Sequence, residues 1–218
     1  INDKDMLKPD GILEIPDIGL GEAYRGKASY VVYDEEDIDD DLLELVCARK
    51  YNEPLVISET GKFIIREMTV ADLPHLYELY QTLSDCPYVE PLYEYEDEKA
   101  FTIKYIENMY GFFGYGLWLV FDKKTGELVA RAGIENRSID GQNCQELGYL
   151  VKKSWQGKHV AWEVMNHIVD IAKDRFGLEE LYICTEKTNN PSIQLALKLG
   201  FTLYAGDTDG MNIYRKKL

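Results

Sequence analysis

The sequence lacks several features that would tie it to a particular class of protein. No apolar run approaches the roughly 20 residues of a membrane-spanning helix, and no signal peptide is visible, so we expect no membrane partner. The four cysteines (Cys47, Cys86, Cys144 and Cys184) are far apart and form no Cys-x-x-Cys pair. Because zinc sites and disulfide frameworks depend on such spacings, we expect reduced thiols, no metal site and a cytoplasmic location.

Positive charge is also scarce. The 218 residues include 24 Lys and Arg against 39 Asp and Glu, which gives a formal net charge of −15. A chain with this balance repels phosphate backbones, so we expect no nucleic-acid partner. The acidic excess is concentrated at the start, since residues 1–60 hold 16 acidic and 6 basic residues, whereas residues 61–218 hold 23 and 18. This asymmetry predicts two parts of different character.

Residues 1–59 form the first part, an acidic N-terminal extension. Residues 1–24 are rich in Asp, Pro and Gly and indicate a loop or arm. Short β-branched runs at 28–33 and 55–58, with a helical spacing at 39–50 between them, predict a small β-α-β unit. Such a unit is too small for a core of its own. We therefore expect it to pack on the main domain, on a partner domain or in a homodimer, and the break at 59–61 to mark the boundary.

Residues 60–218 predict one larger domain. The pattern gives strands at 62–67, 117–121, 128–135, 144–151, 181–185, 201–204 and 211–215. Helices are expected at 69–84, 98–110, 160–176 and 190–200. The resulting order, β-α-α-β-β-β-α-β-α-β-β, is typical of an α/β (α+β) fold in which helices flank a mixed, mostly antiparallel sheet.

The main functional signal lies in residues 146–176. A strand runs into a short basic turn that contains glycine, and the turn opens a long amphipathic helix. Backbone N–H groups and the positive end of a helix dipole meet at such a point, which suits an anion such as a pyrophosphate. Taken alone, the same pattern also fits an ordinary basic turn before a helix.

Four stretches together resemble the GNAT family of N-acetyltransferases. Residues 155–161 (Trp-Gln-Gly-Lys-His-Val-Ala) are similar to its Gln/Arg-x-x-Gly-x-Gly/Ala signature. Residues 60–66 with Asp72, residues 146–149, and residues 189–192 with 198–201 are similar to motifs of the subgroup that includes the ribosomal-protein alanine N-acetyltransferases. The resemblance covers residues 60–218. It implies the GNAT fold, acetyl-CoA as donor, an amine as acceptor, and direct attack without a covalent enzyme intermediate.

The resemblance also implies roles for particular residues. The residues expected to bind acetyl-CoA are Tyr149, Leu150, Val151, Gln156, Gly157, Lys158, His159, Val160, Ala161, Asn189 and Ser192. Ser192 is expected to protonate the CoA thiolate, because Ala196 stands where many relatives have a tyrosine; the alternative is a serine that satisfies first-turn N–H groups. Asn189 is expected either to bind the pantetheine arm or to cap the helix. His159 departs from the signature, which has glycine there, and puts tight CoA binding in doubt.

Two carboxylates are candidates for the general base. Glu146 shares one face of its strand with Gly148 and Leu150, and a carboxylate at that place could take a proton directly or through water. The alternative is a solvent-facing residue of a half-exposed sheet. Glu135, on the neighbouring strand, is the second candidate. The tyrosine-rich, acidic segment 85–97 is expected to form part of the acceptor wall, where it would suit a cationic amine.

The sequence therefore favours a cytoplasmic, acetyl-CoA-dependent N-acetyltransferase that acts on a protein N-terminus or a small amine. The alternative is a non-catalytic CoA-binding or regulatory module that docks a partner through residues 1–59. His159, Ala196 and the extra β-α-β unit favour the alternative, and the four ordered motifs favour the enzyme.

Overall fold

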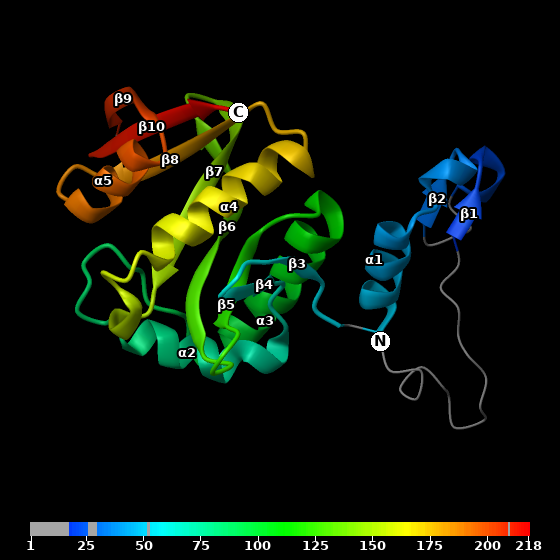
Figure 1. Cartoon of the computed structure of the whole chain (residues 1–218), viewed down its shortest axis with the longest axis horizontal. Coiled ribbons are helices and arrows are strands. Elements are labelled where there is room, and N and C mark those ends of the chain that lie inside the picture. The colour runs from blue at the N-terminus through cyan, green and yellow to red at the C-terminus, as the bar shows by residue number, and fades with distance from the viewer. Residues whose placement is uncertain (1–17, 26–29, 52, 209) are drawn as a thin grey trace. The chain divides into compact units, whose positions relative to one another are not determined.

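The computed structural model describes residues 18–25, 30–51, 53–208 and 210–218. The chain divides into two compact units, residues 1–55 and 56–218 (Figure 1). Most of the loop expected at residues 1–24 lies outside the described residues. No helix in the described part of the chain is both long and apolar enough to cross a membrane.

The first unit contains two short strands and one helix. β1 (Ile18–Leu20) pairs in parallel with β2 (Tyr30–Val32), and α1 (Asp40–Tyr51) follows. β2 and α1 were predicted, whereas β1 was not. The Asp39 carboxylate accepts the Leu42 N–H at 2.8 Å, and two acids occupy the first turn of α1. These groups satisfy free N–H groups and favour the helix dipole, which explains why α1 begins there.

The second unit is built on one eight-stranded sheet. Its strands, in spatial order, are β3 (Val56–Glu59), β4 (Phe63–Arg66), β5 (Leu117–Asp122), β6 (Leu128–Ile139), β7 (Gln142–Val151), β8 (Glu180–Glu186), β10 (Met211–Lys217) and β9 (Thr202–Thr208). Every neighbouring pair is antiparallel except β7 and β8, which are parallel. The structure thus confirms the expected mixed, mostly antiparallel sheet and the predicted order of elements from β4 onward.

The strand expected at 55–58 belongs to this sheet and does not complete the N-terminal unit. It forms β3, which pairs antiparallel with β4. The Thr60 hydroxyl accepts the N–H groups of Lys62 at 3.2 Å and Phe63 at 2.9 Å. These bonds close a tight turn at 60–62. The polar break in the sequence is therefore a hairpin turn between two adjacent strands.

Four α-helices flank the sheet: α2 (Leu73–Gln81), α3 (Tyr95–Tyr105), α4 (Val160–Asp174) and α5 (Asn190–Lys198). The helix predicted at 98–110 begins earlier, because the buried Glu98 carboxylate accepts the Tyr93 N–H at 3.1 Å and anchors the first turn. It then continues as a π-helical segment (Ile106–Phe113), which ends at Gly114 with φ 75°. Such π-helical turns are often found near functional sites.

The helices divide between the two faces of the sheet (Figure 1). α4 packs on β6 and β7 with a row of buried side chains: Val160, Val164, Met165, Ile168, Val169 and Ala172. On the other face, Arg131 and Glu135 project from alternate positions of β6 toward Tyr80 of α2 and Tyr105 of α3. The central strands β5, β6 and β7 are thus covered on both sides, and their middle forms the core.

Candidate active site

The sheet opens between β7 and β8. These two strands pair at a single position, Glu146 with Tyr182, whereas β6 and β7 pair continuously from Ala130–Val151 to Ile139–Gln142. Beyond Glu146, the side of β7 that faces β8 has no strand partner in the described part of the chain. The edge at residues 148–151 therefore presents backbone N–H and C=O groups that an extended ligand can pair with.

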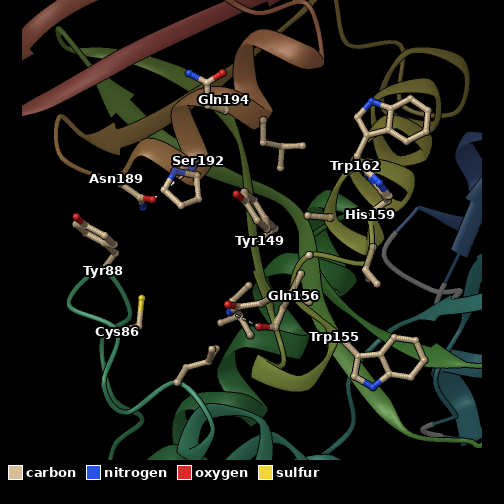
Figure 2. A pocket seen from close by; sticks show the side chains of 18 of the residues that line it. Cys86, Tyr88, Tyr149, Trp155, Gln156, His159, Trp162, Asn189, Ser192 and Gln194 are labelled. Carbon is tan, nitrogen blue, oxygen red and sulfur yellow. Dashed lines mark hydrogen bonds between the residues drawn. The ribbon is translucent and has the colours of Figure 1, made fainter.

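A pocket of about 520 Å³ lies along this open edge (Figure 2). Its walls come from the end of β7, the turn before α4, the start of α5 and the loop after α2. The sequence-predicted residues among its lining are Tyr149, Leu150, Val151, Gln156, Gly157, His159, Val160, Ala161, Asn189 and Ser192. Lys158 is the one predicted CoA-binding residue that does not line it. Residues as far apart in the sequence as Tyr149 and Ser192 thus meet around one cavity.

The turn before α4 has two residues with left-handed backbone. Gly157 has φ 74° and His159 has φ 64°, and His159 directly precedes the first residue of α4. This conformation favours glycine, and histidine is among the side chains that tolerate it best. The departure from the signature at His159 therefore leaves the backbone path intact. The first N–H groups of α4 have no acceptor within the helix and lie at the pocket, where they can donate to an anion.

Side chains of the turn mainly hold it in place. The Gln156 amide donates to the Val151 carbonyl at 3.0 Å and ties the turn to the end of β7. The Trp155 indole donates to Glu127 at 3.0 Å. Two of the basic residues are ion-paired: Lys152 with Glu127 at 2.7 Å and Lys153 with Asp85 at 2.8 Å.

Lys158 is placed differently, since its ammonium lies 5.1 Å from the centre of the Trp155 ring. The positive field that the basic turn offers a phosphate is therefore weaker than its three lysines suggest. The backbone N–H groups become the main anion-binding feature of the turn.

The start of α5 forms the opposite wall of the pocket. The Asn189 side chain accepts the Ser192 N–H at 3.3 Å, so it caps the helix, which is one of its two expected roles. Figure 2 shows Asn189 and Ser192 beside Tyr149, whose ring projects into the pocket from β7. Burial raises the pKa of the Tyr149 phenol, and a hydrogen bond with Ser192 partly offsets this rise. A phenol and a hydroxyl thus lie together at this wall, and both keep their protons at neutral pH.

The two candidate carboxylates lie where the sheet begins to open. Glu146 accepts from the Arg137 guanidinium at 2.9 Å and from the Cys184 N–H at 3.3 Å, and it does not line the pocket. Glu135 is directly opposite Glu146 in the β6–β7 register. It accepts from the Tyr105 hydroxyl at 3.1 Å. Burial raises the pKa of Glu135, while Arg131 and the Tyr105 hydrogen bond partly oppose this rise.

Part of the pocket wall was not predicted from the sequence. Cys86 and Tyr88 line it from the loop after α2, and the Tyr88 hydroxyl donates to Thr188 at 3.1 Å, which ties this loop to the approach of α5. At the other end, Trp162 of α4 lies under the ammonium of Lys198 at 4.7 Å, and both line the pocket. The first pair lies in a loop without a local motif. Trp162 follows the signature directly and could have been identified from that position.

Comparison with known proteins agrees with this geometry. The family model for the acetyltransferase (GNAT) domain matches residues 62–202. A relative from Bacillus subtilis (strain 168), the uncharacterized protein YkkB, is 28% identical over 88 residues, which cover 40% of this chain and 51% of YkkB. The chain thus matches about half the length of that relative.

Solved structures share the fold of the second unit. One is a ribosomal-protein-S5-alanine acetyltransferase from Vibrio fischeri, with a TM-score of 0.62 and 15% identity over 73% of this chain and 95% of that one. Another is RimL, a ribosomal L7/L12 α-N-protein acetyltransferase in complex with coenzyme A, with a TM-score of 0.63 and 16% identity over 75% and 98%. At such identities the likeness shows the fold.

Proposed function

The chain belongs to the acetyltransferase (GNAT) family, and from this premise we propose that it transfers an acetyl group from acetyl-CoA to a primary amine, either a protein N-terminus or a small amine. The observation that carries the proposal is the pocket at the open edge of β7. It joins unpaired strand backbone to a helix N-terminus, and these two features suit the two amides and the pyrophosphate of one extended ligand.

The residues around the pocket suggest how the donor is held. The backbone of Tyr149 to Val151 would pair with the pantetheine amides, and the N–H groups at the start of α4 would bind the pyrophosphate. Gly157 and His159, both with left-handed backbone, turn the chain so that these groups face the pocket. Lys158, whose ammonium lies over the Trp155 ring and which does not line the pocket, would add positive field without a direct contact.

The chemistry requires two proton transfers beside the thioester. The acceptor ammonium first gives a proton to a carboxylate, and its freed lone pair attacks the thioester carbon. The C–N bond forms, the C–S bond breaks, and the departing thiolate takes a proton. Ser192 is the proposed donor of that proton, and the Tyr149 phenol beside it can return one to Ser192. The two candidates for this carboxylate are Glu135 and Glu146, which pair across β6 and β7 next to the point where β7 and β8 separate.

The segment between α2 and α3 supports a cationic acceptor. Residues 85–98 contain six acidic residues and no Lys or Arg. Five of the acids (Asp85, Glu90, Glu94, Glu96 and Asp97) are exposed, and Tyr93 and Tyr95 lie exposed among them. Carboxylates and aromatic faces both attract ammonium groups. An acceptor with positive charge near its reacting amine fits this surface better than a neutral one.

Two measurements test the proposed function. Calorimetric titration with acetyl-CoA should give one saturable site, and the absence of binding at millimolar ligand would rule the proposal out. Release of free thiol from acetyl-CoA, followed with a panel of basic peptides, neutral peptides and polyamines, should then show turnover that is fastest with the cationic acceptors. Tight binding without turnover on any amine would instead favour a non-catalytic CoA-binding module.

A further inference from the structure

Two carboxylates face each other where the sheet opens, and their surroundings differ. Glu135 of β6 and Glu146 of β7 are directly paired in the antiparallel register, so both project from the same face. Side chains at such positions have their Cβ atoms about 5 Å apart. Like charges at this distance disfavour each other. The two groups therefore cannot be treated as equal, and their partners decide which one can accept a proton.

Both carboxylate oxygens of Glu146 accept a hydrogen bond from a neighbouring strand. One oxygen accepts from the Arg137 guanidinium at 2.9 Å, and the other accepts from the Cys184 backbone N–H at 3.3 Å. Cys184 lies on β8 two residues beyond Tyr182, the single point at which β8 pairs with β7. The Glu146 carboxylate thus replaces a missing strand hydrogen bond and holds β8 beside β7. Both oxygens of the Glu146 carboxylate therefore already have a hydrogen-bond donor within the protein.

One carboxylate oxygen of Glu135 accepts a hydrogen bond, and the other has no donor in the described part of the chain. Its Oε1 accepts from the Tyr105 hydroxyl at 3.1 Å, and Oε2 has no hydrogen-bond partner within the described part of the chain. The residue is half-buried, so solvent still reaches it. An oxygen of this kind can receive a proton directly or through one water molecule.

Tyr105 is itself held in one orientation. Its hydroxyl accepts the Leu117 N–H at 2.7 Å, so the single proton of the phenol is directed to Glu135. The ring is 8% exposed and packs edge-on against Tyr110, with ring centres 5.6 Å apart. A buried phenol with fixed donor and acceptor partners keeps its position. Tyr105 can therefore set both the direction and the basicity of the Glu135 carboxylate.

We propose that Glu135 is the general base for the acceptor amine, that Tyr105 is its positioning residue, and that Glu146 serves to hold β8 at the point where the sheet opens. This inference rests on the proposed acetyl transfer. The ammonium proton passes to Oε2 of Glu135, and the amine then forms the C–N bond as the C–S bond breaks. Glu135 afterwards releases its proton to solvent through its exposed side.

The surroundings of Glu135 agree with this role. The groups that face it are Tyr105 from α3, Arg131 and Arg137 from its own strand, and Glu146 from β7. Burial raises its pKa, and the Glu146 charge adds to that effect against the two arginines and the tyrosine. The Cys184 thiol is not a competing base, since burial and the nearby Glu146 raise its pKa to about 12.

The test compares three variants: Glu135→Gln, Glu146→Gln and Tyr105→Phe. Glu135→Gln should lower kcat by about a hundredfold or more, as expected for loss of a general base, with unchanged acetyl-CoA affinity and melting temperature. Glu146→Gln should lower the melting temperature and slow turnover by less than about tenfold at a temperature where the variant is folded. The opposite pattern, with turnover lost in Glu146→Gln and kept in Glu135→Gln, would overturn the inference.

Tyr105→Phe supplies a readout that a purely structural role would not change. The Tyr105 hydrogen bond lowers the pKa of Glu135, so its loss should move the acidic limb of the kcat–pH profile to higher pH. Tyr115→Phe is the matched control, because it removes a tyrosine hydroxyl that donates to Asn136 of the same strand at 2.8 Å, and it should leave the limb in place. An unshifted limb in Tyr105→Phe contradicts the positioning role.

Failure of the inference can be told apart from failure of the proposed function. If wild-type protein binds acetyl-CoA and acetylates amines while Glu135→Gln remains fully active, only the assignment of the base is wrong. If wild-type protein neither binds acetyl-CoA nor turns over any amine, the proposed function is wrong, and the assignment of Glu135 is overturned with it.

Discussion

The groups that we propose to bind acetyl-CoA are mainly backbone N–H and C=O groups, whereas the two candidate carboxylates are held by side chains from distant elements. In the pocket, the open edge of β7, the left-handed turn and the first N–H groups of α4 come from one continuous stretch, residues 148–161. Around Glu135, by contrast, the contacts come from α3, β5 and β7. Side-chain substitutions in the stretch 148–161 should therefore affect ligand binding little. Substitutions among the side chains that surround Glu135 should have large effects.

The carboxylates of Asp72 and Glu135, which differ in their hydrogen-bond donors, can also be compared. Asp72 receives two bonds from the Arg66 guanidinium, at 2.9 and 2.6 Å, and one from the Thr69 N–H at 2.8 Å. Burial raises its pKa, but the bonds from Arg66 and Thr69 outweigh burial, and the net pKa is lowered. Glu135 has one donor and a net raised pKa. Saturation with donors thus separates a structural carboxylate from one suited to proton transfer.

The largest expected loss of stability comes from a substitution at Gly133, which lies on the same strand as Glu135. A Cβ atom on Gly133 would lie 1.9 Å from the Gly116 carbonyl oxygen, which is a backbone atom that cannot move aside without displacing β5. Gly133→Ala should therefore lower the free energy of unfolding by more than about 3 kcal/mol. It should also disturb Leu117, whose N–H orients Tyr105.

Gly61→Ala is the control for Gly133→Ala. A Cβ there meets nothing within 4 Å, and its φ is not positive, so the free energy of unfolding should change by less than about 0.5 kcal/mol. Urea unfolding measures both variants. Equal free energies of unfolding for Gly133→Ala and Gly61→Ala would show that β5 can shift freely. The surroundings of Glu135 would then be less rigid than the structure indicates.

A smaller effect is expected from Asp72→Asn, which leaves the half-buried Arg66 guanidinium without its carboxylate. The loss should be about 1–3 kcal/mol at pH 7. Because the folded-state pKa of Asp72 lies below that of the unfolded chain, near 3.8, the stabilisation is present above that value and is lost as the pH falls through the folded pKa. Urea unfolding at several pH values should show the gap between wild type and variant closing below about pH 4. A gap independent of pH would contradict the assignment.

The sequence predicted which residues surround the pocket better than it predicted the partners of the two candidate carboxylates. The turn, its glycine and the helix start are local, so residues 155–161 and Asn189 could be identified from the resemblance of short motifs to those of the family. The register that sets Glu135 opposite Glu146, and the ion pair that occupies Glu146, depend on pairing between strands. Tyr105 lies about 30 residues from Glu135 in sequence, so no local pattern could connect them. The position of Glu146 on its strand could be predicted from the sequence, whereas its contacts with Arg137 and Cys184 could not.

The smallest expected change in stability and in acetyl-CoA affinity comes from a substitution at His159, in the turn before α4. If the pocket binds its ligand through backbone, replacing His159 by glycine should keep the left-handed turn at φ 64° and remove the strain of a side chain there. His159→Gly should raise the free energy of unfolding by about 0.5–1 kcal/mol, and the acetyl-CoA dissociation constant from calorimetry should change by less than about threefold. His159→Val is the matched control, because a β-branched residue resists this conformation and should weaken both stability and binding. A loss of acetyl-CoA affinity of tenfold or more in His159→Gly would mean that the imidazole itself contacts the ligand, and the pocket would then depend on a side chain as the carboxylate site does.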